Sequence, residues 1–419
     1  MAVLRRAPIG ARAVLAATWQ ARVLDTGTVQ DELTRLWAEL GDPGFGGDGA
    51  GEASGEALDA QPRSGSGAML TRANTLNLLA VASSDAEATR VETAIHHLTD
   101  FYPSRAIIFH THAVPDDQRG GGLDVRVALL EQAALRNRPV VRFESITVSA
   151  DATRADHLAS VASPLLVAEL PDFLWWPGDS PSRSPLFTDL AGLVDHLIVD
   201  TASFADQPRE LVFLAKLAQA SDHAFNLSDF AWARLAPWRQ LTAQFFDMVA
   251  VQPCLDCLDE VAIDYAVPSD DTGSGFSAAL LAASWLATRL GWESIDRLEP
   301  SGGGWWAPLR AHTGSRRRDV TLRLRPVTSE TAIHSLSNLK LTARGEAAGT
   351  FAIERISEPA LTTSSETPTM PKVSRMVYTR PFDDAVLLGN ELRDFNRDRV
   401  FEEALNFAAT LLPESDTSR

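Results

Sequence analysis

Short apolar runs alternate with helix-forming segments between about residues 70 and 200, and this alternation constrains the fold more than any other feature. Each run has the length of one buried strand, and the runs are 75–81, 106–109, 140–148, 165–168 and 197–199. Ser84 and Glu87 stand at the spacing of a capping box, which predicts a helix to about Leu98, and further helices fit at 151–161 and 185–194. Strands that alternate with helices in this way predict an α/β domain with a mostly parallel, Rossmann-like sheet.

The pattern changes character near residue 225. We expect one long helix from Asp229 or Trp238 to Val249, a strand at 260–267 and a helix at 276–290. The later elements are strands at 319–325, 336–342 and 350–356, a Ser/Thr/Pro-rich loop at 357–372, and a helix at about 384–412. The three late strands alternate apolar and polar residues, as antiparallel strands with one solvated face do. This half therefore predicts an α+β domain with an antiparallel sheet.

The chain of 419 residues is long enough for about two domains with substantial cores. Residues 1–40 predict an N-terminal arm, in which a strand or short helix precedes an amphipathic helix. Residues 41–68 are rich in Gly, Ala and Ser and predict a disordered linker, because they cannot bury enough apolar surface to offset the entropy of ordering. The expected domains are then an α/β domain at 69–224 and an α+β domain at 225–412.

The charge and the cysteine content exclude several classes of partner and compartment. A formal net charge of −17 repels nucleic acid and anionic membranes, and the basic run Arg316–Arg318 is expected to be a solvated hairpin or loop. No stretch approaches the ~20 apolar residues that cross a bilayer, and the first residues lack the pattern of a signal peptide. Two cysteines give no disulfide framework. We therefore expect a cytoplasmic protein with neither a nucleic-acid partner nor a membrane partner.

The sequence contains no recognisable catalytic motif, and its one cysteine pair at a known motif spacing is Cys254-Leu-Asp-Cys257. This pair is either incidental or redox-sensitive, although it follows Pro253 rather than opening a helix in a thioredoxin-like pattern. A zinc site would need two more ligands at a suitable spacing, and none is nearby. We expect no metal, no cofactor and no catalytic residue.

Arg105, in Pro103-Ser-Arg105, joins the end of an expected helix to an expected strand. A guanidinium there could hold a carboxylate or a phosphate through two parallel hydrogen bonds. A surface salt bridge is the alternative, and the sequence alone favours it over an anion contact.

Two segments are rich in Trp, Arg and Pro, namely 170–178 and 229–239. Trp and Arg are the side chains most enriched at the energetic centres of protein interfaces. Core packing is the alternative for the tryptophans, but Pro and Gly flank several of them, and a Pro-bounded Trp pair in a loop is hard to bury fully. The candidate contact residues of these segments are Trp175, Trp176, Trp232, Arg234, Trp238 and Arg239.

The order of these segments resembles the OpcA family of glucose-6-phosphate dehydrogenase assembly proteins over roughly residues 70–410. The landmarks are Tyr102-Pro-Ser-Arg105, the segments 170–178, 194–200 and 229–239, and the helix at 281–290. Each landmark alone is weak, and the ordered series is specific. The chain departs from the family pattern at Tyr102, where His is customary, and at Ser284, where Gly is usual.

The resemblance implies a non-catalytic assembly factor that binds glucose-6-phosphate dehydrogenase directly and activates it allosterically. Such a protein would support the oxidative pentose phosphate pathway and the supply of NADPH. The six Trp and Arg residues of the two rich segments are then partner contacts, and Arg105 is an anion contact. Two alternatives remain: a sugar-phosphate enzyme that pairs Asp200 with His196 or Arg105, and a metabolite sensor that uses the α/β domain.

Overall fold

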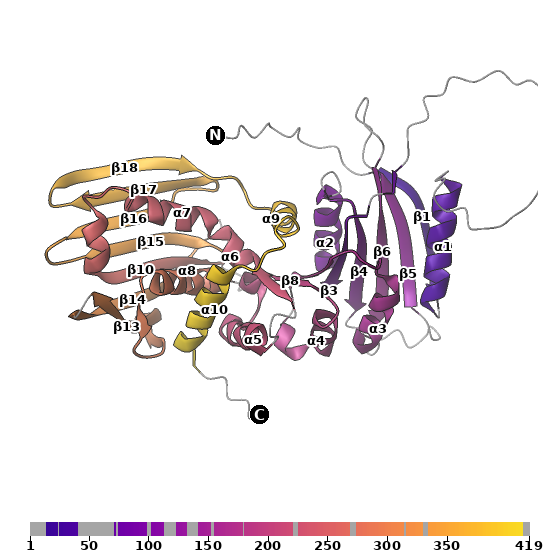
Figure 1. The fold of residues 1–419 in the computed structure, drawn as a ribbon, viewed down its shortest axis with the longest axis horizontal. Coiled ribbons are helices and arrows are strands. Elements are labelled where there is room, and N and C mark those ends of the chain that lie inside the picture. The colour runs from indigo at the N-terminus through magenta and orange to yellow at the C-terminus, as the bar shows by residue number, and fades with distance from the viewer. Residues whose placement is uncertain are drawn as a thin grey trace, which may run out of the picture. The chain divides into compact units, whose positions relative to one another are not determined.

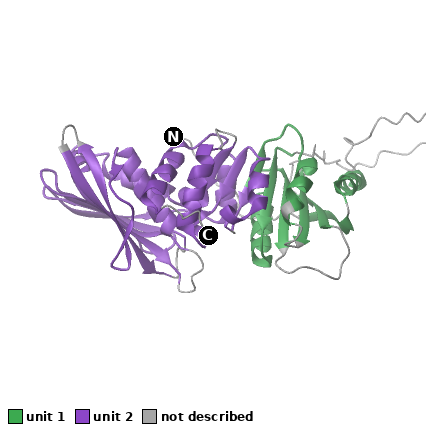
Figure 2. Ribbon diagram, turned by 90° about the horizontal axis from the view of Figure 1, so that it is seen from below, with its two compact units in different colours: residues 1–174 green, residues 175–419 purple. Residues whose placement is uncertain are grey.

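The protein is described by a computed structural model, which divides into unit 1, residues 1–174, and unit 2, residues 175–419 (Figure 2). The structure describes residues 14–23, 25–40, 71–72, 74–98, 102–112, 123–131, 141–151, 155–178, 180–220, 225–268, 274–313, 316–329 and 334–413. The expected linker at 41–68 lies outside these residues, and the expected domain boundaries stay a prediction.

Unit 1 is built on a mixed sheet with the strand order β1-β5-β6-β4-β3, and β2 pairs with β6. The strands are β1 (Val14–Val23), β2 (Thr71–Arg72), β3 (Leu76–Ala82), β4 (Ser104–His112), β5 (Leu123–Glu131) and β6 (Val141–Asp151). The pairs β3–β4, β4–β6 and β2–β6 are parallel, whereas β5 runs antiparallel to both β6 and β1. Every residue of β3 is buried, as its continuous apolar run predicts.

The two longer helices of unit 1 begin at capping side chains, Asp25 and Ser84. The helices are α1 (Thr26–Glu39), α2 (Asp85–Leu98) and α3 (Leu158–Ala162), and α3 lies between the 3₁₀ turns η2 (Ala155–His157) and η3 (Ser163–Leu165). At the start of α2, the Ser84 hydroxyl accepts the Glu87 N–H at 3.2 Å, which confirms Ser84 as the cap, whereas the Glu87 carboxylate accepts the N–H of Ser83 at 2.8 Å rather than that of Ser84. Helix α1 is amphipathic as predicted and buries Val29, Leu33, Leu36 and Trp37.

The strand predicted at 165–168 is wrong. Pro164 lies in the turn η3, and Glu169 adopts a left-handed conformation with a φ of 67°, so the chain turns where a strand was expected. The strand forms instead at β7 (Asp172–Trp176), where the chain passes from unit 1 into unit 2.

Unit 2 contains the parallel strand pair β8 (His196–Val199) and β9 (Asn226–Asp229), and a second sheet. The second sheet has the strand order β11-β13-β14-β10-β15-β16-β17-β18, and β12 pairs with β13. Its strands are β10 (Leu258–Val267), β11 (Glu293–Ser294), β12 (Glu299–Ser301), β13 (Gly304–Thr313), β14 (Arg316–Thr328), β15 (Leu336–Ala343), β16 (Gly349–Arg355), β17 (Ala360–Thr367) and β18 (Met370–Tyr378). All of its pairs are antiparallel except β10–β14. The predicted fold class, a mostly parallel N-terminal sheet and an antiparallel C-terminal sheet, is confirmed.

Helices cover one face of this second sheet (Figure 1). The helices of unit 2 are α4 (Pro185–Ala191), α5 (Gln207–Ala220), α6 (Phe230–Arg234), α7 (Ala236–Phe245), α8 (Phe276–Arg289), α9 (Asp384–Glu391) and α10 (Arg399–Leu411), with 3₁₀ turns η4 (Pro181–Arg183), η5 (Thr201–Ser203) and η6 (Gln252–Cys257). The other face carries ion pairs such as Arg325–Asp264 at 2.7 Å and Arg323–Glu260 at 3.2 Å. One face is therefore solvated, as the alternating pattern predicts.

Three predicted elements of unit 2 differ in the structure. The helix expected from Asp229 or Trp238 to Val249 begins near the second of these starts, as α7, and ends at Phe245. Residues 230–234 form a separate helix, α6, because Pro237 removes a backbone donor at the first turn of α7. The Ser/Thr/Pro-rich stretch expected as a loop forms most of the hairpin β17–β18. The last expected helix is divided into α9 and α10, since Asp398 caps α10 by accepting the Phe401 N–H at 2.9 Å.

No helix in the described part of the chain is long and apolar enough to cross a membrane.

Candidate functional site

The Trp pair of the first rich segment lies on β7 and not in a loop. Trp175 and Trp176 are 0% and 3% exposed. Trp175 packs on Phe230 with ring centroids 5.9 Å apart, and Trp176 meets Phe187 edge to face at 5.0 Å. The structure thus brings Trp175 to the start of the second rich segment, and both indoles form part of the core.

Asp229, the first residue of the second rich segment, holds that segment in place through buried hydrogen bonds. Its side chain caps α6 by accepting the Ala231 N–H at 2.9 Å, and it also accepts the Thr201 N–H at 3.0 Å and the Thr201 hydroxyl at 2.6 Å. Asp229 is 1% exposed. Burial raises the pKa of Asp229 to about 7, the nearby Asp200 adds to the rise, and these hydrogen bonds oppose it. The caps and the burial hold α6 at the carboxyl end of β9.

Asp200, at the carboxyl end of β8, pairs with Arg234 of α6. The guanidinium donates from Nη1 to Oδ1 at 2.7 Å and from Nη2 to Oδ2 at 2.9 Å, and the Ser203 hydroxyl donates to Oδ2 at 3.1 Å. The Asp200 side chain is fully buried and the Arg234 side chain is 12% exposed. Burial lowers the pKa of Arg234, but the charge and hydrogen bonds of Asp200 outweigh it, so the pKa is raised above its ordinary value. This fork-to-fork pair positions α6 rather than leaving either group unpaired.

Arg239 and Trp232 stack against one another at the junction of α6 and α7. The Arg239 guanidinium carbon lies 3.5 Å from the centre of the Trp232 ring, a cation–π contact. The Trp232 indole donates to Asp398 Oδ2 at 2.8 Å and is 4% exposed. Burial lowers the pKa of Arg239 to about 10, although Asp398 and Glu391 oppose this. The carboxyl groups of Glu391 and Asp398 therefore stabilise the charged form of the partly buried Arg239.

Trp238 of α7 is also buried, with 1% exposed. The Arg355 guanidinium carbon lies 5.5 Å from the centre of its ring. Among the described residues, neither Trp238 Nε1 nor Trp175 Nε1 has a hydrogen-bond partner. Trp232 differs from both, because its indole N–H is satisfied.

His196 begins strand β8 and Asp200 follows the end of that strand, and the structure gives the two residues different partners. His196 Nε2 contacts the Ser228 hydroxyl at 2.9 Å, and the ring is 3% exposed. Burial lowers the pKa of His196 to about 4, against the charges of Asp394 and Asp195. Because Asp200 is held by Arg234, the acid–base pair that the sugar-phosphate alternative requires is already engaged in structural contacts.

Arg105 lies in unit 1, on β4, and is 7% exposed. Its Nε donates to Glu144 Oε2 at 2.5 Å and its Nη1 to the Leu165 carbonyl at 2.8 Å. Trp37 of α1 donates to the other oxygen of Glu144 at 2.7 Å. The pair is buried and not a surface salt bridge, so that alternative is wrong. The anion that Arg105 holds in the structure is Glu144, and a role toward an external anion stays a prediction.

Cys254 and Cys257 lie in the turn η6, and both are free thiols. Cys254 is buried, and burial raises the pKa of its thiol, as does the neighbouring Cys257. Within the described residues, no group of three or more His, Cys, Asp or Glu side chains could hold a metal ion. A redox role for the pair stays a prediction.

Glu391 and Asp398 are the residues of this site that sequence reasoning missed. Glu391 is partly buried, and burial raises its pKa above the ordinary value, while a hydrogen bond from Ser228 opposes the rise. Asp398 could have been recognised from its position as a helix cap, had the helix at 384–412 been predicted as two. No local pattern marks Glu391.

The partner-binding role of the six Trp and Arg residues remains a prediction. The four tryptophans are core residues in the structure, and the two arginines are partly exposed around them. Because the four indole rings are buried, they support the residues of the surface and do not themselves form it.

Two family models match the chain in succession. The first describes the N-terminal domain of a glucose-6-phosphate dehydrogenase subunit and matches residues 95–216. The second describes the C-terminal domain of the same subunit and matches residues 225–405. Together they account for most of the chain.

Curated relatives match over a shorter stretch. A stretch of 159 residues, 38% of this chain and 32% of the relative, is 34% identical to an OxPP cycle protein named OpcA from Nostoc punctiforme. A stretch of 153 residues, 36% of this chain and 30% of the relative, is 30% identical to a protein of the same name from Synechocystis sp.. The matched region thus spans about a third of the length of each relative.

Solved structures resemble the chain only distantly. Gal80p, a transcriptional regulator of Kluyveromyces lactis, is 9% identical with a TM-score of 0.44 over 80% of this chain and 87% of that one. An oxidoreductase domain protein of Kribbella flavida is 10% identical with a TM-score of 0.41 over 80% of this chain and 95% of that one. No functional conclusion follows from likeness at this level.

Proposed function

Because the chain belongs to the OpcA family of glucose-6-phosphate dehydrogenase assembly proteins, we propose that it binds glucose-6-phosphate dehydrogenase directly, promotes its assembly and activates it allosterically. The observation that carries this proposal is the match of both family models, in order, along the two halves of the chain. The protein itself is non-catalytic in this proposal. It acts in the cytoplasm and supports the oxidative pentose phosphate pathway and the supply of NADPH.

The hydrogen bonds of the buried charged groups support a binding role. Asp200, Asp229 and Arg234 have their hydrogen-bonding capacity directed at one another or at neighbouring backbone. A catalytic group must instead reach a substrate within hydrogen-bond distance. These residues therefore favour a rigid scaffold over a reaction centre.

Activation requires that the protein bind the active form of the dehydrogenase better than the inactive form. A tenfold shift between the two forms needs about 1.4 kcal/mol of differential affinity. A few well-packed contacts supply that amount. In this proposal Trp175, Trp176, Trp232 and Trp238 fix the shape of a contact surface to which Arg234 and Arg239 contribute charge.

The test is a titration of the cognate dehydrogenase with this protein at fixed substrate, together with size-exclusion chromatography. Saturable activation and co-elution of the two proteins are the expected results. If the dehydrogenase rate stays constant and the two proteins elute separately, the proposal fails. Turnover of sugar phosphates by the isolated protein would favour the enzyme alternative instead.

A further inference from the structure

Strand β18 forms one edge of the second sheet of unit 2 and pairs with β17 on one side (Figure 1). Within the described residues, no strand pairs with its other side. An edge strand presents a row of unpaired N–H and C=O groups, which is a template for another strand. Natural proteins shorten, twist or cover such an edge, or place Pro and Lys on it; β18 runs for nine residues and carries Pro371 and Lys372 near its start, so the stretch from Val373 to Tyr378 is the part without Pro.

The main-chain groups that face the free edge can be identified from the hydrogen bonds on the other side. The Arg375 carbonyl accepts the Thr363 hydroxyl of β17 at 3.4 Å, and the Thr379 N–H donates to the Pro359 carbonyl at 2.8 Å. Backbone groups of successive residues in a strand point to opposite sides. The even-numbered residues of this stretch, Ser374 and Met376 among them, therefore direct their N–H and C=O groups to the free edge.

Exposed apolar side chains lie on both faces of β18. Val373 is 59% exposed, Met376 53% and Tyr378 73%. The Arg375 side chain donates to Gln244 of α7 at 3.0 Å, so the odd-numbered residues face the helices and the even-numbered residues face the solvated side. The edge thus offers apolar contacts to a strand on either of its faces.

The charge of this edge is opposite to that of the whole chain. Between Glu366 and Asp383 the chain has three basic residues, Lys372, Arg375 and Arg380, and no acidic one, although the net charge of the protein is −17. A second copy of the chain would place an equally basic strand alongside, and like charges on adjacent strands are destabilising. An acidic strand would pair favourably and would be steered to the edge by the same charges.

We propose that β18 is a docking edge on which an extended, acidic segment of glucose-6-phosphate dehydrogenase pairs as an added strand. The proposal rests on the proposed function for the identity of the partner. Main-chain hydrogen bonds to Ser374 and Met376 provide affinity, while Met376 and Tyr378 provide side-chain contacts. The docking edge is then a second contact with the partner, in addition to the surface that the buried Trp residues, Arg234 and Arg239 shape.

The first test replaces one main-chain donor on the free edge. Ser374→Pro removes the N–H that faces the free edge and keeps the ladder with β17, since proline is tolerated on edge strands when its missing N–H faces solvent. Ser374→Ala keeps the N–H and is the matched control. We expect Ser374→Pro to weaken the affinity for the purified dehydrogenase at least about tenfold, equivalent to 1.4 kcal/mol, and Ser374→Ala to change it less than about twofold.

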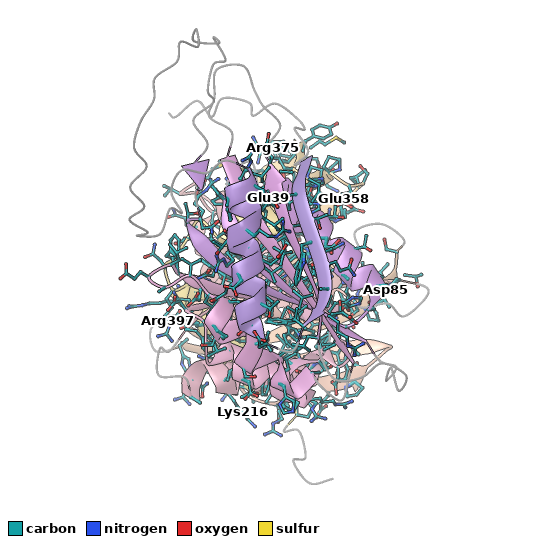
Figure 3. All side chains as sticks on the ribbon, turned by 90° about the vertical axis from the view of Figure 1, so that its right-hand side faces the viewer. Glu39, Asp85, Lys216, Glu358, Arg375 and Arg397 are labelled. Carbon is teal, nitrogen blue, oxygen red and sulfur yellow. The ribbon has the colours of Figure 1, made fainter. Side chains whose placement is uncertain are left out.

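The second test changes charge without touching the backbone, in case Ser374→Pro does not fold. Lys372→Glu should weaken binding and reduce the salt dependence of association, because the net charge of the stretch between Glu366 and Asp383 falls from +3 to +1. Lys216→Glu, a reversal on α5, is its matched control and should bind as the unaltered protein does. Arg375 of β18 is labelled near the top of Figure 3 and Lys216 near its bottom.

The outcomes separate this proposal from the proposed function. If the unaltered protein binds the dehydrogenase and both β18 variants bind equally well, the docking edge is wrong while the proposed function holds. If the unaltered protein does not bind, both fail. If light scattering shows the protein alone to be a dimer that Ser374→Pro dissociates, a second copy occupies the edge and this proposal is overturned.

Discussion

Arg234 binds Asp200 through two parallel hydrogen bonds of 2.7 and 2.9 Å, and this buried pair ties helix α6 to the end of strand β8. The residues lie 34 positions apart in the chain. Their pairing fixes where the segment Asp229–Arg239 leaves the β8–β9 pair.

Removal of one member of this pair should destabilise unit 2 strongly. Arg234→Met leaves the Asp200 carboxylate buried without its cation, and we expect a loss of about 3–5 kcal/mol in the free energy of unfolding. The double variant Asp200→Leu/Arg234→Met should lose less than Arg234→Met alone, because no uncompensated charge remains. Urea unfolding followed by tryptophan fluorescence measures both, and additive losses would contradict a coupled pair.

Two buried tryptophans of the rich segments should respond differently to substitution by phenylalanine. Trp232→Phe removes a hydrogen bond to the charged Asp398, which costs about 1.5–3 kcal/mol. Trp175→Phe removes an indole N–H that has no partner among the described residues, so only volume is lost. We expect Trp232→Phe to lower the melting temperature more, and equal shifts would argue against the Asp398 contact.

Substitution of a buried tryptophan by alanine should weaken dehydrogenase binding only because it destabilises the fold. Trp175→Ala and Trp238→Ala each delete a fully buried aromatic side chain, with an expected cost of about 3–5 kcal/mol. Circular dichroism and dehydrogenase binding should therefore decline together. Weakened binding with an unchanged melting temperature would instead assign these residues to the contact surface.

His196 should make the protein sensitive to mild acid. Its folded pKa of about 4 lies below the unfolded value of 6.5, so the unfolded chain binds a proton that the folded protein does not. Stability from this group is present above pH 6.5 and is lost as pH falls from 6.5 to 4, by about 3 kcal/mol.

His196→Asn should remove this part of the pH dependence. Chemical denaturation at several pH values between about 4 and 7 measures the difference between variant and unaltered protein, in which contributions of other groups such as Asp229 cancel. His312→Asn, at a partly exposed histidine of the same unit, is the control. Parallel curves for His196→Asn and the unaltered protein would disprove the prediction.

Arg105 should prove essential for stability rather than for binding an external anion. Arg105→Lys keeps the charge but cannot reach both Glu144 and the Leu165 carbonyl in the same fork geometry. We expect a loss of about 1–3 kcal/mol. Differential scanning calorimetry checks this, and unchanged stability combined with lost stabilisation by a sugar phosphate would identify a ligand contact.

The two cysteines should react at different rates with a thiol reagent. Cys254 is 3% exposed and its thiol pKa is raised, whereas Cys257 is partly exposed. Thiolate is the reactive form, so Cys257 should be labelled first. Mass spectrometry of partly labelled protein shows the order, and Cys257→Ser should remove the fast phase.

Local patterns predicted the elements whose neighbours are close in sequence. The buried strands β3 and β8 followed from short apolar runs, and α2 from the capping box of Ser84 and Glu87. These features depend on contacts within a few residues, which a sequence displays directly.

Elements whose character depends on distant neighbours were missed. The Trp pair of β7 is flanked by Pro and Gly, which favoured a loop, yet tertiary packing against Phe230 and Phe187 buries both rings. Strand β17 was missed for the same reason. Leu361 and Thr363 lie on its buried face, but the many Ser and Thr residues of the stretch favoured a loop. The bond from Trp232 to Asp398 spans 166 positions, and no local pattern indicates it.

Asp398 serves two helices with one carboxylate, because Oδ1 caps α10 at Phe401 while Oδ2 accepts the indole N–H of Trp232. During synthesis at roughly 5–20 residues per second, Trp232 leaves the ribosome about ten to thirty seconds before its partner. From the time α8 has emerged until α10 follows it, the faces of α5 and α8 that α10 packs against lie open on the nascent chain. The core of unit 2 therefore closes only when its latest helix has been made, and until then chaperones have a defined surface to protect.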